Sequence, residues 1–191
     1  LASAQKVSKL TVIVDYNKWQ ATGRSKEVLA IEPLKGKWES FGWDTQEIDG
    51  HDFSQIKNVD AILICVPTPL FEKKIPDLSY ILSSLNSIKK YLRKGQILVL
   101  ESTTYPTTTE ELILPLIEKN SGLSHGKDFW LAYSPERVDP GNKNYNTKNT
   151  PKVIGALDDL GLLIAEKIYK KAISTVHKVS SPRVAEMVKI L

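Results

Sequence analysis

The chain has 191 residues, of which 41% are hydrophobic and 25% charged, and its formal net charge is +4. This length fits one domain of ordinary size, or one domain and a fragment. No apolar run is long enough to cross a bilayer and no secretory leader is recognisable, so we expect no membrane association and a cytoplasmic location. The lysines are dispersed rather than grouped in basic runs, which argues against nucleic-acid binding.

The single cysteine, Cys65, excludes a disulfide within the chain. It stands in the apolar run AILICVP, a context in which free thiols are usually buried. We therefore expect Cys65 to be an inert core residue and not a nucleophile.

The first third of the chain predicts strand, helix and strand. The β-branched run at 10–15 (LTVIVD) is typical of a buried strand, and the polar stretch after it reads as a loop. Helical spacing of apolar residues follows over 26–41, with Pro33 interrupting or starting the helix. A short strand is expected over 43–48, before the turn at Asp49-Gly50.

The remainder alternates regularly between the two kinds of element. Strands are expected at 60–66, 96–102, 129–133, 152–155 and 174–179, and helices at about 77–92, 107–118, 157–171 and 181–191. Such alternation predicts an α/β protein with a mostly parallel sheet flanked by helices.

Polar residues directly follow two of these strands. Ser102 and Thr103 end the strand at 96–102, and Glu136 comes just after the strand at 129–133. Because ligands of open α/β sheets bind outside the carboxyl ends of the strands, we expect these side chains to share one site. Taken singly, such residues have ordinary alternatives: Thr103 suits a strand or a helix cap, and Glu101 a solvated strand end.

Several longer motifs occur in a fixed order along the rest of the chain: VDAILICVPTPL, PDLSYI, YLRKGQILVLESTTYP, YSPERVDPGNKN, PKVIG and VSSPRVAEMVK. In order and spacing, residues 52–191 resemble the UDP-glucose/GDP-mannose dehydrogenase family, and most of all its members that oxidise UDP-N-acetyl-hexosamines. The resemblance implies a Rossmann-like NAD-binding domain over 57–191, incomplete at both ends.

The resemblance also implies a chemistry and its residues. The family oxidises the C6 alcohol of a nucleotide sugar to a carboxylate, with NAD as the oxidant. Thr103 matches a threonine that holds the catalytic water, Glu136 a glutamate acting as a base, and Lys189 a lysine that stabilises the developing alkoxide. Arg137, together with Glu136 and Lys189, matches the substrate-binding positions. The cofactor positions that the resemblance implies are Val66, Pro67, Thr68, Glu101, Ser102 and Thr103.

The chain departs from the family pattern in three respects. Where the resembled family usually has Pro-Gly-Thr after the Ser-Thr strand, this chain has Pro106-Thr107-Thr108. It lacks the Gly-x-Gly loop that lets a backbone approach the cofactor pyrophosphate. The family's nucleophilic cysteine and UDP-binding domain would lie beyond Leu191. We therefore expect weak NAD binding, no turnover by this chain alone, and association with another dehydrogenase subunit as a possible role.

A second resemblance concerns residues 8–56, which are similar to the thiamine-diphosphate domain of transketolases. It implies that Asn17 and Trp19 contribute oxygen ligands to Mg²⁺, and that residues 1–56 form a strand–helix–strand fragment of a chimeric chain. Two alternatives to the dehydrogenase thus stay open: a thiamine-diphosphate enzyme fragment and a non-catalytic interaction domain.

Overall fold

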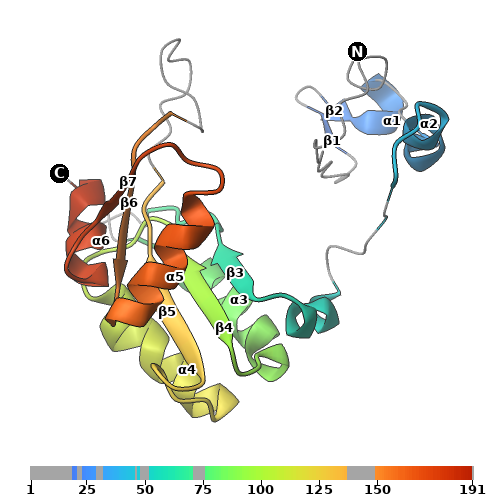
Figure 1. Ribbon diagram of the computed structural model, residues 1–191. Coiled ribbons are helices and arrows are strands. Elements are labelled where there is room, and N and C mark those ends of the chain that lie inside the picture. Colours follow the sequence, from blue (N-terminus) through green and yellow to red (C-terminus); the bar gives the residue numbers. More distant parts are fainter. Residues whose placement is uncertain are drawn as a thin grey trace. The chain divides into compact units, whose positions relative to one another are not determined.

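The computed structural model describes residues 19–20, 23–28, 32–45, 47, 52–70, 76–136 and 149–190. The chain divides into two compact units, Leu1–Asp52 and Phe53–Leu191 (Figure 1). The predicted strand at 10–15 and the predicted site residues Asn17 and Arg137 lie outside the described residues. No helix in the described ranges is long and apolar enough to span a bilayer.

The first unit contains short elements only. Strands β1 (Trp19–Gln20) and β2 (Gly23–Arg24) pair antiparallel, and helices α1 (Ser25–Val28) and α2 (Leu34–Ser40) follow. The helical pattern over 26–41 is divided at Pro33, as the sequence predicts: Pro33, with no N–H to donate, stands at the N-cap of α2 in an extended conformation. The predicted strand at 43–48 is not formed at residues 43–45.

Helix α2 is followed directly by a local aromatic contact. The rings of Trp38 and Trp43 meet edge to face with centroids 5.0 Å apart. Such pairs stabilise folded structure beyond the area that they bury. The Trp43 N–H also donates to the Trp38 carbonyl, so Trp43 turns back on α2 at the point where a strand was expected to begin.

The second unit is an α/β domain with a five-stranded sheet in the order β3-β4-β5-β6-β7. All pairs are parallel except β5 with β6, which confirms the predicted fold class. Its elements are η1 (Phe53–Asn58), β3 (Ala61–Ile64), α3 (Ser79–Ile88), η2 (Lys89–Tyr91), β4 (Gln96–Leu100), η3 (Thr108–Ile113), α4 (Leu114–Ser121), β5 (Phe129–Tyr133), β6 (Lys152–Ala156), α5 (Asp159–Tyr169), β7 (Val176–Lys178) and α6 (Pro182–Ile190).

The predicted helix at 107–118 is in fact two segments of different pitch. Its first part, η3, is a π-helix, and α4 begins at Leu114 with a proline in its first turn. Proline removes a helical N–H donor and its ring clashes with the carbonyl four residues earlier. The wider turn before Pro115 relieves that clash, and the Leu114 N–H donates five residues back to the Thr109 carbonyl.

The reversed strand β6 changes which residues lie at the carboxyl edge of the sheet. Tyr133 and Ala132 of β5 pair with Gly155 and Ala156 of β6. Because β6 runs antiparallel to β5, its first residue, Lys152, lies beyond the carboxyl end of β5. The start of β6 thus joins the ends of β3, β4 and β5 at one edge.

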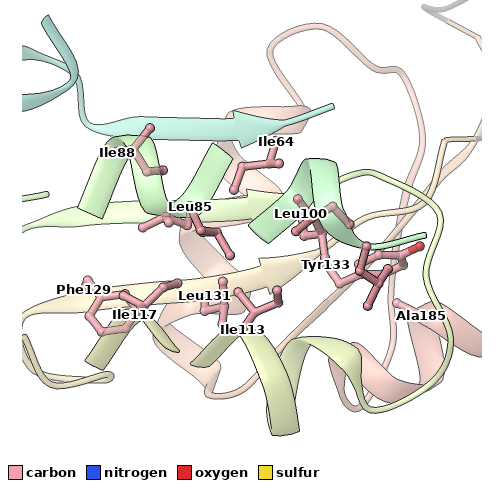
Figure 2. Close-up of a cluster of buried hydrophobic side chains, with 13 residues drawn as sticks. Ile64, Leu85, Ile88, Leu100, Ile113, Ile117, Phe129, Leu131, Tyr133 and Ala185 are labelled. Carbon is pink, nitrogen blue, oxygen red and sulfur yellow. The ribbon is translucent and has the colours of Figure 1, made fainter. Parts of the chain in front are cut away.

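The core fills both faces of the sheet. All five residues of β4 are buried, and their side chains alternate between the two faces. Leu98 and Leu100 belong to the cluster that α3, η3 and α4 cover, which Figure 2 shows between those helices and the sheet. Ile97 and Val99 belong to the second cluster, with Ala165 and other residues of α5. Burial on both faces gives β4 the continuous apolar run typical of a central parallel strand.

Helix α6 approaches β6 at a glycine. A Cβ atom on Gly155 would lie 2.1 Å from the Ser181 carbonyl oxygen and 3.0 Å from the Pro182 nitrogen. Both partners are backbone atoms at the start of α6, so they cannot rotate away as a side chain does. Gly155 therefore fixes how close the first turn of α6 lies to the sheet.

We expect Gly155→Ala to lower the free energy of unfolding by at least about 1–3 kcal/mol, because the added methyl group must displace the start of α6. Urea denaturation measures this change. Gly36→Ala is the control, since its Cβ meets nothing within 4 Å and alanine favours the helix there. Equal stability of Gly155→Ala and the unchanged chain would contradict the close approach.

Candidate functional site

The ends of β3 and β4 are joined by one serine side chain. The Ser102 hydroxyl accepts a hydrogen bond from the Val66 N–H at 2.9 Å and donates to the Val66 carbonyl at 2.8 Å. Ser102 is buried, whereas Pro67 and Thr103 beside it are exposed. The ends of β3 and β4 are therefore held at a fixed spacing, with Pro67 and Thr103 facing solvent. This edge is called the ledge below.

The end of β5 is held in a similar way by Ser134. Its N–H donates to the Leu100 carbonyl at 3.0 Å and its hydroxyl to the Val153 carbonyl at 2.8 Å. Ser134 is fully buried, and the chain emerges two residues later at the exposed Glu136. The serine thus fixes the point at which Glu136 leaves the sheet.

The structure brings Glu136 together with Lys189. The Lys189 ammonium donates to the Glu136 backbone carbonyl at 2.7 Å and lies 3.3 Å from its Oε2 atom. Lys189 is half-buried in α6, and Glu136 is exposed. A carboxylate and an ammonium 53 residues apart in sequence thereby meet at the carboxyl edge of the sheet. Thr103 follows the neighbouring strand β4 at the same edge.

A buried carboxylate lies beneath these residues. Glu186, one turn before Lys189 in α6, has no exposed surface. Its Oε1 accepts from the Thr109 hydroxyl at 2.6 Å and N–H at 2.9 Å, and its Oε2 from the Thr107 N–H at 2.7 Å. The Thr104 hydroxyl lies 3.5 Å from Oε1. Glu186 therefore ties α6 to the first turn of η3.

Burial also shifts the ionisation of this cluster. Desolvation raises the pKa of Glu186, while the hydrogen bonds from Thr109 and Thr107 oppose the rise. Burial raises the pKa of Tyr133 to about 12, and the charge of Glu186 adds to that effect. The Tyr133 ring lies in the core beside Ala185 of α6 (Figure 2).

The turn that Glu186 binds has an unusual backbone. Thr107 has a φ of 81°, in the left-handed region, and it is the one non-glycine residue with positive φ in the described part of the chain. A β-branched residue is strained there because its Cβ crowds the backbone. The hydrogen bond from the Thr107 N–H to the buried carboxylate offsets part of that cost.

Glu101 lies at the same edge but points into a second polar cluster. It accepts from the Lys152 ammonium at 2.9 Å and from the Tyr169 hydroxyl. The Lys152 ammonium also lies 5.0 Å from the centre of the Tyr169 ring. Both oxygens of Glu101 are thus engaged by protein partners. Burial, followed by the Glu101 charge, raises the pKa of Tyr169.

The expected burial of Cys65 is wrong: its side chain is exposed at the end of β3. Leu63, two residues earlier on the same face, is also 43% exposed, which shows that the described helices of the second unit leave this face of β3 uncovered. Partial desolvation and the charge of Glu101 raise the pKa of the Cys65 thiol. A thiol held in its protonated form is a weak nucleophile.

Sequence reasoning did not single out Lys152, Tyr169 and Glu186. Lys152 and Glu186 stand in the quoted motifs PKVIG and AEMVK, but only the reversal of β6 and the packing of α6 give them contacts with the site. A charged residue between apolar ones, such as Glu186 after Val184 and Ala185, is the one local signal of a buried carboxylate.

The NAD-binding-domain model of the UDP-glucose/GDP-mannose dehydrogenase family matches residues 8–173. The chain belongs to this family. The family domain takes its name from NAD, which agrees with the cofactor expected from the sequence. The assignment of individual site residues stays a prediction.

Individual relatives agree with the family match. The UDP-N-acetyl-D-glucosamine 6-dehydrogenase of Pseudomonas aeruginosa is 36% identical over 174 residues, which are 90% of this chain and 39% of the relative. An NDP-N-acetyl-D-galactosaminuronic acid dehydrogenase from Methanosarcina mazei Go1 superposes with a TM-score of 0.66 at 34% identity, over 72% of this chain and 30% of that one. A UDP-D-ManNAc dehydrogenase from Pyrococcus horikoshii superposes with a TM-score of 0.67 at 26% identity, over 99% of this chain and 41% of that one.

The comparisons give no support to the transketolase resemblance. The dehydrogenase family model begins at residue 8 and so includes the segment 8–56. The Pyrococcus structure likewise covers nearly the whole chain. Of the two residues proposed as Mg²⁺ ligands, Asn17 lies outside the described residues and Trp19 begins β1. We therefore do not retain the chimera or the thiamine-diphosphate alternative.

We expect Thr107→Gly to raise the free energy of unfolding by about 1 kcal/mol, because glycine adopts the left-handed conformation without strain. The reciprocal control is Gly122→Ala. Gly122 also has a positive φ, of 71°, so this substitution should lower the free energy of unfolding by about the same amount. Chemical denaturation of both variants measures the two changes in the free energy of unfolding. A loss of stability in Thr107→Gly would show that the threonine side chain outweighs its backbone strain.

The raised pKa of Glu186 predicts a pH dependence of stability. Its stabilising contribution is present below its model-compound pKa of 4.5 and is lost as the pH rises through the higher pKa of the folded protein. Glu186→Gln should therefore flatten the fall in unfolding free energy above pH 4.5. Glu111→Gln, on the exposed side of η3, is the matched control and should leave the slope unchanged. Urea titrations across this pH range test both.

Proposed function

We propose that this chain forms the cofactor-binding part of an NAD-dependent dehydrogenase that oxidises the C6 alcohol of a UDP-N-acetyl-hexosamine to a carboxylate. The chain spans about two fifths of the length of the P. aeruginosa relative, so the activity of a complete enzyme is part of the proposal. The observation that carries it is the contact between Lys189 and Glu136 at the carboxyl edge of a parallel sheet.

The ledge at the ends of β3 and β4 supports NAD as the cofactor. Pro67 and Thr103 are exposed there, Val66 and Thr68 are half-buried, and Ser102 fixes the spacing of the two strands. These small side chains leave the edge open to a flat ligand. NAD, when bound, supplies the acceptor for the hydride that leaves the sugar C6 carbon.

In this proposal Glu101 supports the site from behind and does not contact the cofactor ribose directly. Its two oxygens accept from Lys152 and Tyr169, which come from β6 and α5. In that position Glu101 holds the ends of three elements together behind the ledge. A partly buried carboxylate with two partners costs more to displace than an exposed one.

Lys189 and Glu136 are suited to the two charges that develop during the oxidation. The ammonium can stabilise an alkoxide at the C6 oxygen, as a fixed hydrogen-bond donor does in an oxyanion site. The exposed Glu136 carboxylate can accept a proton from a water molecule. A bound sugar hydroxyl would replace the Glu136 atoms that now accept from Lys189.

The second oxidation requires a thiol that forms a covalent intermediate, and Cys65 does not fit that role. It lies at the end of β3 with a raised thiol pKa, next to the proposed cofactor ledge. The proposal therefore includes a separate cysteine, supplied by a further segment or by an associated dehydrogenase subunit.

We expect NAD to raise the melting temperature of the chain, since a ligand that binds only the native state stabilises it by about 2.7 kcal/mol at a hundredfold excess over Kd. Ser102→Ala should weaken this effect because Val66 loses its side-chain partner. Ser87→Ala, which removes a hydroxyl on the outer side of α3, is the control. Absence of any NAD shift in the unchanged chain would contradict the proposed cofactor.

A further inference from the structure

Three polar residues lie one turn apart on α6: two of them contact η3, and the third contacts the segment after β5. Arg183 donates to Glu110 of η3 at 2.9 Å, Glu186 accepts from the first turn of η3, and Lys189 donates to Glu136 after β5. Residues three apart are neighbours on a helix surface. The rotation of α6 that suits Glu186 therefore also decides where the Lys189 side chain can reach.

We propose that Glu186 is a positioning residue that sets Lys189 against Glu136 through its hydrogen bonds to η3. This inference rests on the proposed function, in which Lys189 and Glu136 are site residues. Glu186 itself touches neither of them. It acts through the backbone of α6, whose next turn carries Lys189.

The contacts of Glu186 are stronger and more specific than the other tie between α6 and η3. Both of its oxygens accept backbone N–H groups, from Thr107 and Thr109, in a fully buried setting. Losing this acceptor would leave buried N–H donors unsatisfied, which costs more than losing an exposed contact. By contrast, the side chain of Arg183 is 53% exposed, and exposed ion pairs contribute little.

The same carboxylate also reaches the strand end that carries Thr103. The Thr104 hydroxyl lies 3.5 Å from its Oε1 atom, and Thr104 directly follows Thr103. Glu186 thus lies beneath both sides of the proposed site: the end of β4 on one side and α6 on the other. In this way a single buried carboxylate can fix the position of Lys189 relative to the cofactor ledge.

The test is the rate at which Lys189 is reductively methylated in the native chain, read peptide by peptide by mass spectrometry. Its ammonium is tied to Glu136, so we expect slow modification relative to the exposed Lys127 and Lys167. Glu186→Gln should speed the modification of Lys189 about fivefold, because the variant loses the free energy that one hydrogen bond contributes on balance. The two reference lysines should be unaffected.

Matched variants separate positioning from loss of stability. Thr109→Val keeps the shape of the side chain but removes the hydroxyl that donates to Glu186, and should speed modification in the same direction. Thr109→Ser restores that donor and should return the rate to that of the unchanged chain. Ile88→Val, which weakens the core under α3, should leave the Lys189 rate unchanged.

An unchanged Lys189 rate in both Glu186→Gln and Thr109→Val would overturn the inference, as would an equal rise in Ile88→Val. If Glu186→Gln does not fold, the Thr109 pair decides alone. The assay contains no NAD, so it can fail while NAD still stabilises the chain. A chain that fails to bind NAD would instead refute the proposed function, whatever the methylation rates.

Discussion

The geometry of the candidate site depends on side-chain hydrogen bonds that continue the sheet where its backbone ladder ends. Ser102 joins the ends of β3 and β4, and Ser134 joins the end of β5 to β4 and β6. Each serine is buried, so a lost partner would leave an unsatisfied polar group at the edge. These two residues allow exposed neighbours such as Thr103 and Glu136 to lie on a fixed base.

The backbone at the start of η3 shows how the chain tolerates an unfavourable residue. Glycine is the residue that left-handed positions favour, and the related dehydrogenase motif that the sequence resembles has glycine where this chain has Thr107. The structure keeps the left-handed turn all the same, with φ at 81°. The N–H of that turn donates to Glu186, and such a partner helps a strained conformation persist.

Much of the second unit could be predicted from its sequence. The strands β4 and β5 and the helices α3, α5 and α6 lie within a few residues of their expected ranges, because apolar runs and helical spacing determine them locally. The first unit could not be predicted equally well. The interruption of its helix at Pro33 was expected, but Trp43 packs back on Trp38 of α2, where the pattern predicted the start of a strand.

The site was predictable only in part, and the reason is physical. Thr103 and Glu136 follow strands, so their edge can be inferred from the order of elements. The exposure of Cys65 depends on which elements cover β3, and an apolar run alone does not reveal that. The role of Glu186 depends on the packing of α6 against η3, two segments almost 80 residues apart.

The reversed direction of β6 decides which residue pairs with Glu101. A parallel β6 would carry Lys152 to the opposite edge of the sheet and leave Glu101 without its cation. Instead the lysine meets Glu101 at 2.9 Å with only 13% of its side chain exposed. Such a pair is costly to assemble but more costly to break, because one buried charge would remain alone. The strand direction therefore supplies the cation that pairs with Glu101. Partial burial and the Glu101 charge raise the pKa of the nearby Cys65 thiol, and Lys152 opposes that rise.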